Sequence, residues 1–276
     1  MRIYRSCPTI ITVSILISLA LTTFTTGQAQ AHQLSFVGPK QHYLALGDSM
    51  AFGYQPDLNF SHGYAEDFGH DLEQQQSGRD FANMACPGET STTMLTGKCP
   101  YPFLRKYLYL GPQLDAALAY LKTYRGQVSP VTLNIGANNV LPDINATTCV
   151  VNVDKFKADL ATLDTDLKQV ILPKLRSALT VNGVMTGDLV MIGYYDPYQN
   201  MCPNSLSYSG QLNQHLANDI KGYGTMIDTF TAFGGPAIPN PNICTYTWMC
   251  SLFHDFHATD QGHRVVADAI EQTLGY

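Results

Sequence analysis

The residues with the clearest capacity for covalent chemistry are a serine after an apolar run and a histidine near the carboxyl end. Residues 42–54 read HYLALGDSMAFGY. The apolar run stops at Gly47-Asp48-Ser49, which is typical of a short buried strand and a turn. A serine hydroxyl becomes a useful nucleophile when a base, usually a histidine, lies within hydrogen-bond reach. A plain turn, with Asp48 or Ser49 capping the next helix, explains the tripeptide equally well.

Three further stretches favour the chemical interpretation: residues 83–89 (NMACPGE), 136–139 (GANN) and 255–257 (DFH). The backbone N–H of Gly88 and the side-chain amide of Asn138 are donors of the kind that stabilise an oxyanion. A glycine at position 88 also lets the backbone approach a substrate closely. His257 follows all of them in the chain, and it would be the base if folding brought it to Ser49.

These four stretches resemble the SGNH (GDSL-type) hydrolase family, and the resemblance covers nearly all of the chain after residue 40. It implies that Ser49 is the nucleophile and that His257 is the base. It also implies that the N–H groups of Ser49 and Gly88 and the amide of Asn138 form the oxyanion hole. The implied activity is carboxylic-ester hydrolysis by an esterase or lipase, through an acyl-enzyme on Ser49 and without a metal or cofactor.

Two positions depart from the family pattern. The usual Gly-x-Asn-Asp ends here in Asn139, and we expect this change to affect loop bracing rather than chemistry, because the donor is the preceding Asn. The usual Asp three residues before the histidine is His254, and the available carboxylate, Asp255, lies two residues before it. We expect Asp255 to hold His257, because a charged acceptor makes the stronger hydrogen bond. The backbone carbonyl of His254 is the alternative acceptor.

The carboxyl-terminal histidines also allow a metal-site hypothesis. His254, Asp255, His257 and His263 are potential ligands, but their spacing lacks a helical context that would bring them together. We therefore expect no metal site, and we expect His263 in the first turns of a closing helix. Asp48 is interpreted as a brace of the serine turn rather than as a catalytic acid.

Residues 1–31 have the pattern of a secretory signal peptide. They combine a basic start, a mostly apolar stretch over residues 10–20 and a small-x-small site at residues 29–31. A membrane anchor is the alternative, but polar residues interrupt the apolar stretch. We therefore expect secretion and a single domain over residues 32–276.

Charge narrows the range of partners. Without the two arginines of the signal segment, 14 basic and 22 acidic residues remain, a net charge of −8. This charge argues against nucleic acid or an anionic membrane surface as partner. No later run approaches the ~20 apolar residues of a spanning helix, so we expect no stable membrane anchor. We expect a monomer that acts on a small-molecule, lipid or carbohydrate ester.

An even number of cysteines in a secreted chain indicates disulfides. The six after the signal segment are Cys86, Cys99, Cys149, Cys202, Cys244 and Cys250. We favour the pairs Cys86–Cys99, Cys149–Cys202 and Cys244–Cys250. Six cysteines allow fifteen connectivities. The first and last of these pairs close short loops, and the middle pair joins the two cysteines that are left. Zinc is the alternative use, but the sequence holds no C-x-x-C pair.

Strand and helix patterns alternate along the chain, which predicts a parallel sheet covered on both faces. The family resemblance implies the same three-layer α/β/α sandwich of the flavodoxin-like type. The expected strands are 42–47, 79–84, 128–135, 189–194 and 225–229. The expected helices are 62–76, 110–124, 153–180, 205–221 and 259–274, with Pro173 expected to kink or end the third.

Two irregular stretches, 99–110 and 233–252, are interpreted as walls of the substrate cleft, and surface packing pinned by disulfides is the alternative. Three functions are compatible with these patterns. The first is a secreted serine esterase or lipase that binds an acyl chain among aromatic and apolar loops. The second is a carbohydrate acetyl esterase, with an open polar cleft lined by Tyr194, Tyr195, Tyr198 and Tyr208. The third is a non-catalytic binding protein on the same fold.

Overall fold

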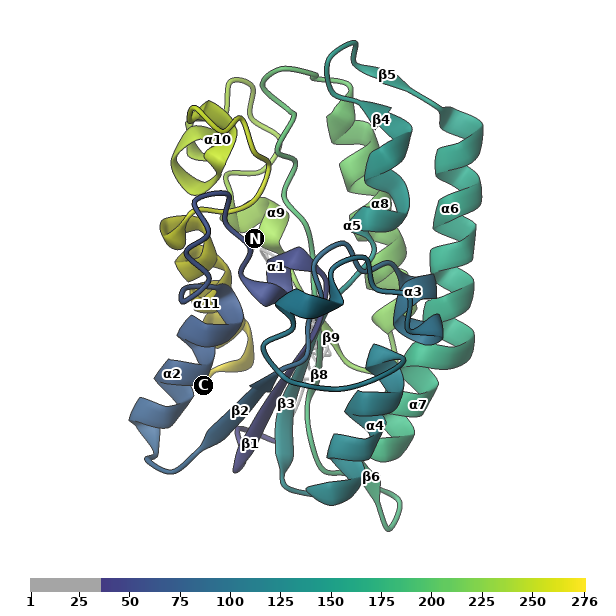
Figure 1. Ribbon diagram of the computed structural model, residues 1–276, viewed down its shortest axis with the longest axis vertical. Helices are drawn as coiled ribbons and strands as arrows, with labels where there is room; N and C mark the ends of the chain where they lie inside the picture. The colour runs from purple at the N-terminus through teal and green to yellow at the C-terminus, as the bar shows by residue number, and fades with distance from the viewer. Residues whose placement is uncertain (1–35) are drawn as a thin grey trace, which may run out of the picture. The chain divides into compact units, whose positions relative to one another are not determined.

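The five apolar runs expected as strands form one parallel sheet in a computed structural model, which describes residues 36–276 (Figure 1). The predicted signal peptide, residues 1–31, lies outside the described residues. All four strand pairs are parallel. In spatial order the strands are β2 (Asp80–Asn83), β1 (His42–Gly47), β3 (Val128–Asn134), β8 (Leu189–Ile192) and β9 (Thr225–Ile227).

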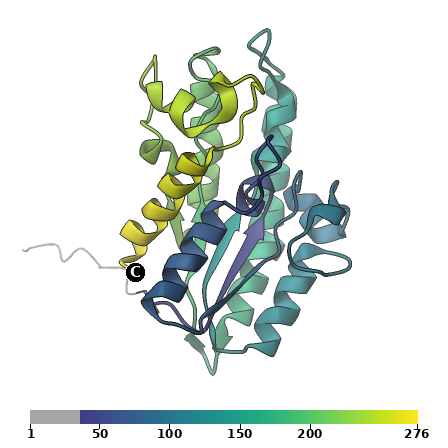
Figure 2. The same ribbon diagram turned by 60° about the vertical axis from the view of Figure 1, so that its left-hand side comes forward.

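Strand order decides which helices cover which face. The chain moves from β1 to β2 in one direction and then reverses, so that β3, β8 and β9 follow on the other side of β1. Right-handed crossovers then put the helix between β1 and β2 on one face and the later crossover helices on the other. The first face carries α2 (Tyr64–Gln75) and α11 (Asp260–Leu274), and the second carries α4 (Gln113–Thr123), α6 (Val153–Asp166), α7 (Leu172–Ala178) and α8 (Ser205–Ile220) (Figure 2).

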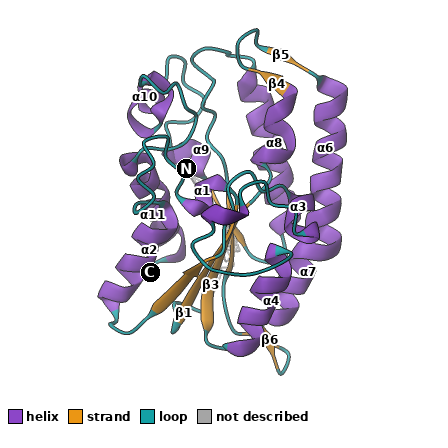
Figure 3. Cartoon of the chain, in the orientation of Figure 1, coloured by secondary structure: helices purple, strands orange, loops and turns teal. Residues whose placement is uncertain are grey.

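The sheet lies between these two helix layers, as Figure 3 shows by its colours. Every residue of β1 and of β3 is buried. Because both faces are buried, neither strand alternates between apolar residues and exposed polar residues. The predicted three-layer α/β/α architecture is confirmed.

The prediction for Pro173 is only partly right. The helical stretch from residue 153 does not end there but continues to Ala178. It passes through a π-helical segment, η3 (Leu167–Ile171), directly before α7, which has Pro173 at its start. A wider turn at this point accommodates a residue that lacks an N–H group and whose ring collides with the preceding turn.

Several short elements were not predicted, because segments of two to six residues carry no readable period. The short helices are α1 (Ser49–Phe52), α3 (Ser91–Thr96), α5 (Ala137–Val140), α9 (Thr229–Ala232) and α10 (Pro241–Tyr246). The 3₁₀ turns are η1 (Pro102–Leu104), η2 (Leu141–Asp143) and η4 (Trp248–Cys250). Two hairpins join β4 (Ile144–Asn145) to β5 (Val150–Val151) and β6 (Thr180–Val181) to β7 (Val184–Met185).

Three disulfides tie down loops outside the sheet. They join the pairs favoured from the sequence, Cys86–Cys99, Cys149–Cys202 and Cys244–Cys250. The first links the turn after β2 to the loop before η1, and the third links α10 to η4. Among residues 36–276, no helix has both the length and the apolarity needed to cross a membrane.

The strand order also locates a crevice. The helices that leave β1 and β3 lie on opposite faces, so the chain diverges at the carboxyl ends of these two strands. Open α/β sheets bind their ligands at such a point. The stretches with Ser49, Gly88 and Asn138 follow β1, β2 and β3 directly, and three of the four expected site stretches therefore meet at this edge.

Candidate active site

Ser49 is the first residue of α1, and only Asp48 separates it from the end of β1. Gly47 makes this turn possible, because it has a φ of +134° and a Cβ there would lie 2.0 Å from the carbonyl oxygen of Asn134. Asp48 caps the short helix, and its Oδ1 accepts the N–H of Met50 at 2.9 Å. The backbone of two central strands thus holds the serine at the edge of the sheet.

His257 and Asp255 lie on the loop between η4 and α11, and they reach Ser49 across the sheet edge. His257 Nε2 lies 2.8 Å from Ser49 Oγ. Its Nδ1 lies 2.6 Å from Asp255 Oδ1, and the same oxygen accepts the backbone N–H of His257 at 2.8 Å. The carboxylate folds back over the two residues that separate it from the histidine, so the short spacing is no obstacle to contact.

The carbonyl of His254, the alternative acceptor, makes no hydrogen bond to His257 within residues 36–276. Burial by itself would raise the pKa of Asp255, but the hydrogen bonds and the charge of His257 outweigh it, and the pKa is lowered. A carboxylate that stays ionised can fix the imidazole tautomer and stabilise the imidazolium form. The three side chains therefore form a continuous hydrogen-bonded series, in which His257 Nε2 is in reach of the serine proton.

Three potential oxyanion donors converge beside the serine. The N–H of Ser49 is at the start of α1, where no partner exists within the helix. Gly88 has a φ of +78°, and its N–H donates no hydrogen bond within residues 36–276. The amide of Asn138 donates to the carbonyl of Glu89 at 3.0 Å, which orients it. All three donor residues line one cavity, together with His257.

A sequence profile of the GDSL-like lipase/acylhydrolase family matches residues 45–265. The chain belongs to this family. The GDSL-like protein is therefore a carboxylic-ester hydrolase, and its substrates are small-molecule esters. A comparison with curated proteins gave no significant match.

Solved structures share the fold of this GDSL-like hydrolase at low sequence identity. A lipase from a goat rumen metagenome superimposes with a TM-score of 0.62 and 15% identity, over 85% of this chain and 97% of that one. An acetylxylan esterase from Geobacillus stearothermophilus gives 0.53 and 15%, over 88% and 97%. A phospholipase A1 from Streptomyces albidoflavus NA297 gives 0.52 and 16%, over 85% and 99%. At such identities the likeness concerns the fold alone.

The loop with the histidine of this GDSL-like hydrolase is supported by the stretch before it. The N–H of Trp248 donates to the carbonyl of His257 at 3.0 Å, and the N–H of Asp255 donates to the carbonyl of Trp248 at 3.3 Å. The indole N–H of Trp248 donates to Gln55 Oε1 at 3.2 Å. The disulfide Cys244–Cys250 brackets this tryptophan. The stretch 233–252 is therefore a support for the histidine loop.

The prediction that this stretch forms a cleft wall is wrong, because none of its residues lines either cavity at Ser49. The other stretch, 99–110, was predicted correctly and supplies Pro100, Tyr101, Phe103 and Leu104 to the open cavity. The opposite wall comes from residues 54–60, through Tyr54, Leu58 and Phe60. These residues come soon after the serine turn, in a segment too short for the sequence to indicate a cleft wall.

Two cavities meet at Ser49 in the GDSL-like hydrolase. The open cavity has a volume of about 790 Å³ and a mainly apolar lining that includes Leu58, Phe60 and Phe103. The narrow cavity has a volume of about 40 Å³ and lies among Met50, Tyr194, Leu212 and neighbouring side chains.

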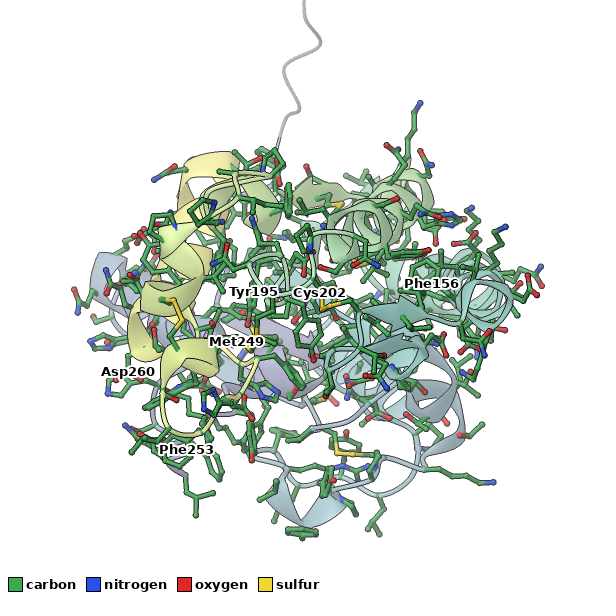
Figure 4. The ribbon with its side chains drawn as sticks, turned by 90° about the horizontal axis from the view of Figure 1, so that it is seen from above. Phe156, Tyr195, Cys202, Met249, Phe253 and Asp260 are labelled. Carbon is green, nitrogen blue, oxygen red and sulfur yellow. A yellow bond between two sulfur atoms is a disulfide. The ribbon has the colours of Figure 1, made fainter. Side chains whose placement is uncertain are left out.

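The proposed polar cleft of tyrosines is not present in the described residues. Tyr194 and Tyr195 are buried, at 7% exposure each, and they line the narrow cavity. Tyr208 packs against Phe156, with ring centroids 5.0 Å apart, and lines neither cavity. Seen from above in Figure 4, Tyr195 lies among packed side chains near the middle, whereas Phe253 lies at the edge of the view. Helix and strand packing, which the sequence alone does not reveal, directs these rings inward.

Sequence reasoning missed Gln113, the first residue of α4. Its side chain accepts the N–H of Gly47 at 2.7 Å and donates to the carbonyl of Gly47 at 2.9 Å. It also donates to Glu89 Oε2 at 3.1 Å. Gln113 thus ties the turn with the serine to the turn with the oxyanion glycine. A glutamine at a helix start is too ordinary to signal such a role.

Asp48 has no contact with His257 in the described residues, and its second oxygen accepts the hydroxyl of Tyr194 at 2.7 Å. Burial raises the pKa of Asp48 to about 7, against the opposing hydrogen bonds from Tyr194 and Met50. Its contacts are those of a brace between the serine turn and the segment that follows β8, which agrees with the interpretation from the sequence.

The four groups of the metal-site hypothesis do not converge in the described part of the chain. Asp255 and His257 contact each other, whereas His263 lies in α11 and its Nδ1 accepts the N–H of Tyr64 at 3.2 Å. Burial lowers the pKa of His263 to about 3. Within residues 36–276, Cys86, Glu89 and Cys99 are the one group with three ligand atoms in reach of one another, and both sulfurs are in a disulfide.

Proposed function

We propose that this GDSL-like hydrolase is a secreted serine esterase that forms an acyl-enzyme on Ser49. The observation that supports it is the continuous hydrogen-bonded series from Asp255 through His257 to Ser49, with separations of 2.6 and 2.8 Å. In this proposal Asp255 and His257 are the acid and base, and the N–H groups of Ser49 and Gly88 and the amide of Asn138 form the oxyanion hole.

The reaction has two halves. Ser49 Oγ attacks the ester carbonyl while its proton passes to His257 Nε2, and the carbonyl oxygen becomes an oxyanion that accepts the three donors. The C–O bond to the alcohol then breaks, and His257 returns the proton to the departing oxygen. A water molecule then attacks the acyl-enzyme in the same way, with His257 again as the base, and the carboxylic acid is released from Ser49.

Secretion and a monomeric state belong to the same proposal. The pattern of residues 1–31 is typical of a secretory signal. Three disulfides support an oxidising compartment. One chain supplies the acid, the base, the nucleophile and all three donors, so the site needs no second subunit.

A carbohydrate acetyl esterase is the second candidate. The small size of the narrow cavity favours it, because an acetyl group is a small acyl group. The similarity of fold to an acetylxylan esterase also favours it. The apolar residues of the open cavity, such as Leu58 and Phe103, favour instead an ester with an apolar alcohol. Rates on phenyl acetate and on acetylated xylan separate the two substrate classes, and xylan as the better substrate would favour the carbohydrate acetyl esterase.

The test of the nucleophile uses a fluorophosphonate probe and p-nitrophenyl acetate. We expect the wild type to be labelled on Ser49 and Ser49→Ala to lose labelling and almost all hydrolysis, by up to about 10⁶-fold in kcat. Ser61→Ala is the control, because this hydroxyl bonds Asn59 on an exposed loop. A folded wild type without labelling would leave a non-catalytic binding protein as the better explanation.

A further inference from the structure

The two cavities at Ser49 differ in their access to the histidine. Ser49, Asn138 and Phe256 line both cavities. His257 and Asp255 line the open cavity and do not line the narrow one. The nucleophile therefore lies where the two cavities meet, and the base lies on one side of it.

This asymmetry assigns the two halves of the ester, if the proposed function holds. In the tetrahedral intermediate the carbon carries Ser49 Oγ, the oxyanion, the alcohol oxygen and the acyl chain. The alcohol oxygen must receive a proton from His257 Nε2, so it lies on the side of the open cavity. The oxyanion faces the donors, and the narrow cavity remains for the acyl chain. We propose that the narrow cavity is the acyl site and that the open cavity is the alcohol site.

The volume of the narrow cavity limits the acyl chain. At about 40 Å³ it is roughly a twentieth of the volume of the open cavity, and it has room for only a few groups of the size of a water or methylene. Counting the carbonyl carbon, which lies at the serine itself, we expect acyl groups of up to about four carbons.

The walls of the narrow cavity have little freedom to widen. Met50, Tyr194 and Leu212 are each less than a tenth exposed. Tyr195 stacks on Phe233 with ring centroids 4.2 Å apart and an interplanar angle of 5°. Close-packed interiors resist added volume, so longer chains should be rejected rather than accommodated.

Three polar side chains of this wall are already paired. The hydroxyl of Tyr194 donates to Asp48 at 2.7 Å, and that of Tyr195 donates to the carbonyl of Phe256 at 2.8 Å. Asp196 accepts the hydroxyl of Ser205 at 2.6 Å. A hydroxylated or charged acyl group would find few partners there, so the acyl site selects short, unsubstituted chains.

The open cavity has the opposite character. Its volume of about 790 Å³ is within the range of sites for drug-sized ligands. Leu58 and Phe103 at its mouth are 70% and 79% exposed. The inferred substrate class is thus short-chain acyl esters, from acetyl to butyryl, of bulky apolar or aromatic alcohols.

The experiment measures kcat/KM on p-nitrophenyl esters from acetyl to dodecanoyl, beside fluorophosphonate labelling. We expect a maximum between two and four carbons and a fall of tenfold or more at hexanoyl. Ile144→Ala enlarges the narrow cavity at a half-buried position and should raise the hexanoyl-to-acetyl ratio at least tenfold. Leu212→Ala is a second enlargement on α8.

Phe103→Ala is the matched control in the open cavity. It should leave the acyl-chain profile unchanged and reduce the preference for benzyl acetate over ethyl acetate. A labelled wild type with its maximum at eight or more carbons, or one whose profile moves with Phe103→Ala but not with Ile144→Ala, would overturn the assignment. Absence of labelling would instead remove the proposed function, and the assignment with it.

Discussion

The two sides of the candidate active site are built in different ways. On the nucleophile side, Ser49 follows a strand whose six residues are all buried, and Gln113 clamps the backbone of the same turn. On the acid–base side, Asp255 and His257 lie on a loop between η4 and α11. Phe253, two residues before Asp255, is 52% exposed.

This difference separates two sources of precision. The position of Ser49 depends on pairing between β1 and β3, which the whole core stabilises. The position of His257 depends on a few local contacts: the Asp255 carboxylate, the backbone of Trp248 and a nearby disulfide. We therefore expect substitutions of the acid–base side chains themselves to alter turnover with little effect on stability, whereas changes in the clamped serine turn should affect both.

The largest effect expected on the acid–base side comes from Asp255→Asn. An amide at this position can hold the wrong tautomer of His257, and kcat should fall by about 10⁴-fold. The measurement is kcat against pH, with unfolding in denaturant as a check on the fold. His254→Ala is the control, because it removes a side chain and keeps the backbone carbonyl. A loss within about tenfold for Asp255→Asn would show that another acceptor suffices.

Asn138→Ala tests the donors that face the nucleophile. Loss of one oxyanion donor should lower kcat by about 10²–10³-fold and change KM little. Asn139→Ala is the matched control, because the amide of Asn139 pairs with Ser91 in two hydrogen bonds and braces its loop. It should affect stability more than turnover. If Asn138→Ala altered KM alone, the oxyanion role would be refuted.

Removal of the disulfide beside Trp248, by Cys244→Ala with Cys250→Ala, tests the support of the histidine loop. Closing so short a loop contributes about 2 kcal/mol. We expect that loss of unfolding free energy and about a tenfold fall in kcat, because small displacements of a catalytic group are costly. The pair Cys149→Ala with Cys202→Ala is the control, since these residues line neither cavity. Equal losses of kcat in both variants would argue against a specific support.

Asp48→Asn is tested on the slope of stability against pH rather than on turnover. Burial raises the pKa of Asp48 from 3.8 to about 7, so the folded protein keeps a proton that the unfolded chain loses in this window. Stability from this group therefore falls as pH rises from about 4 to about 7, by up to about 1.4 kcal/mol per pH unit.

The Asp48→Asn variant should lack this decline, and urea unfolding at several pH values measures the difference from the wild type. The difference in stability between variant and wild type is the quantity to compare, because His263 changes the stability of both with pH in the opposite direction. Burial lowers the pKa of His263 to about 3, so its contribution rises with pH up to its unfolded value of about 6.5. Parallel curves for wild type and variant would contradict a raised pKa at Asp48.

Much of the fold follows from local sequence. The apolar runs of β1 and β3 and the apolar face of α11 depend on residue type and period, and the structure has elements at all three. The cysteine pairs at 86–99 and 244–250 are close in sequence, so proximity alone favoured them. The family motifs indicate Ser49 and His257, which are 208 positions apart in the chain and which the structure brings within hydrogen-bond distance.

Tertiary structure decided the features that depend on which surfaces meet. The residues of 54–60, rather than those of 233–252, form the second wall of the open cavity. Tyr195 points inward because its ring packs against Phe233, and Tyr194 points inward because its hydroxyl bonds Asp48. Both rings form walls of the narrow cavity. Gln113 reaches Gly47 because the chain after β2 returns to the end of β1 before α4 begins. Residue type and spacing determine local structure and chemical capacity, whereas side-chain direction and cavity shape arise from contacts between segments that are distant in the chain.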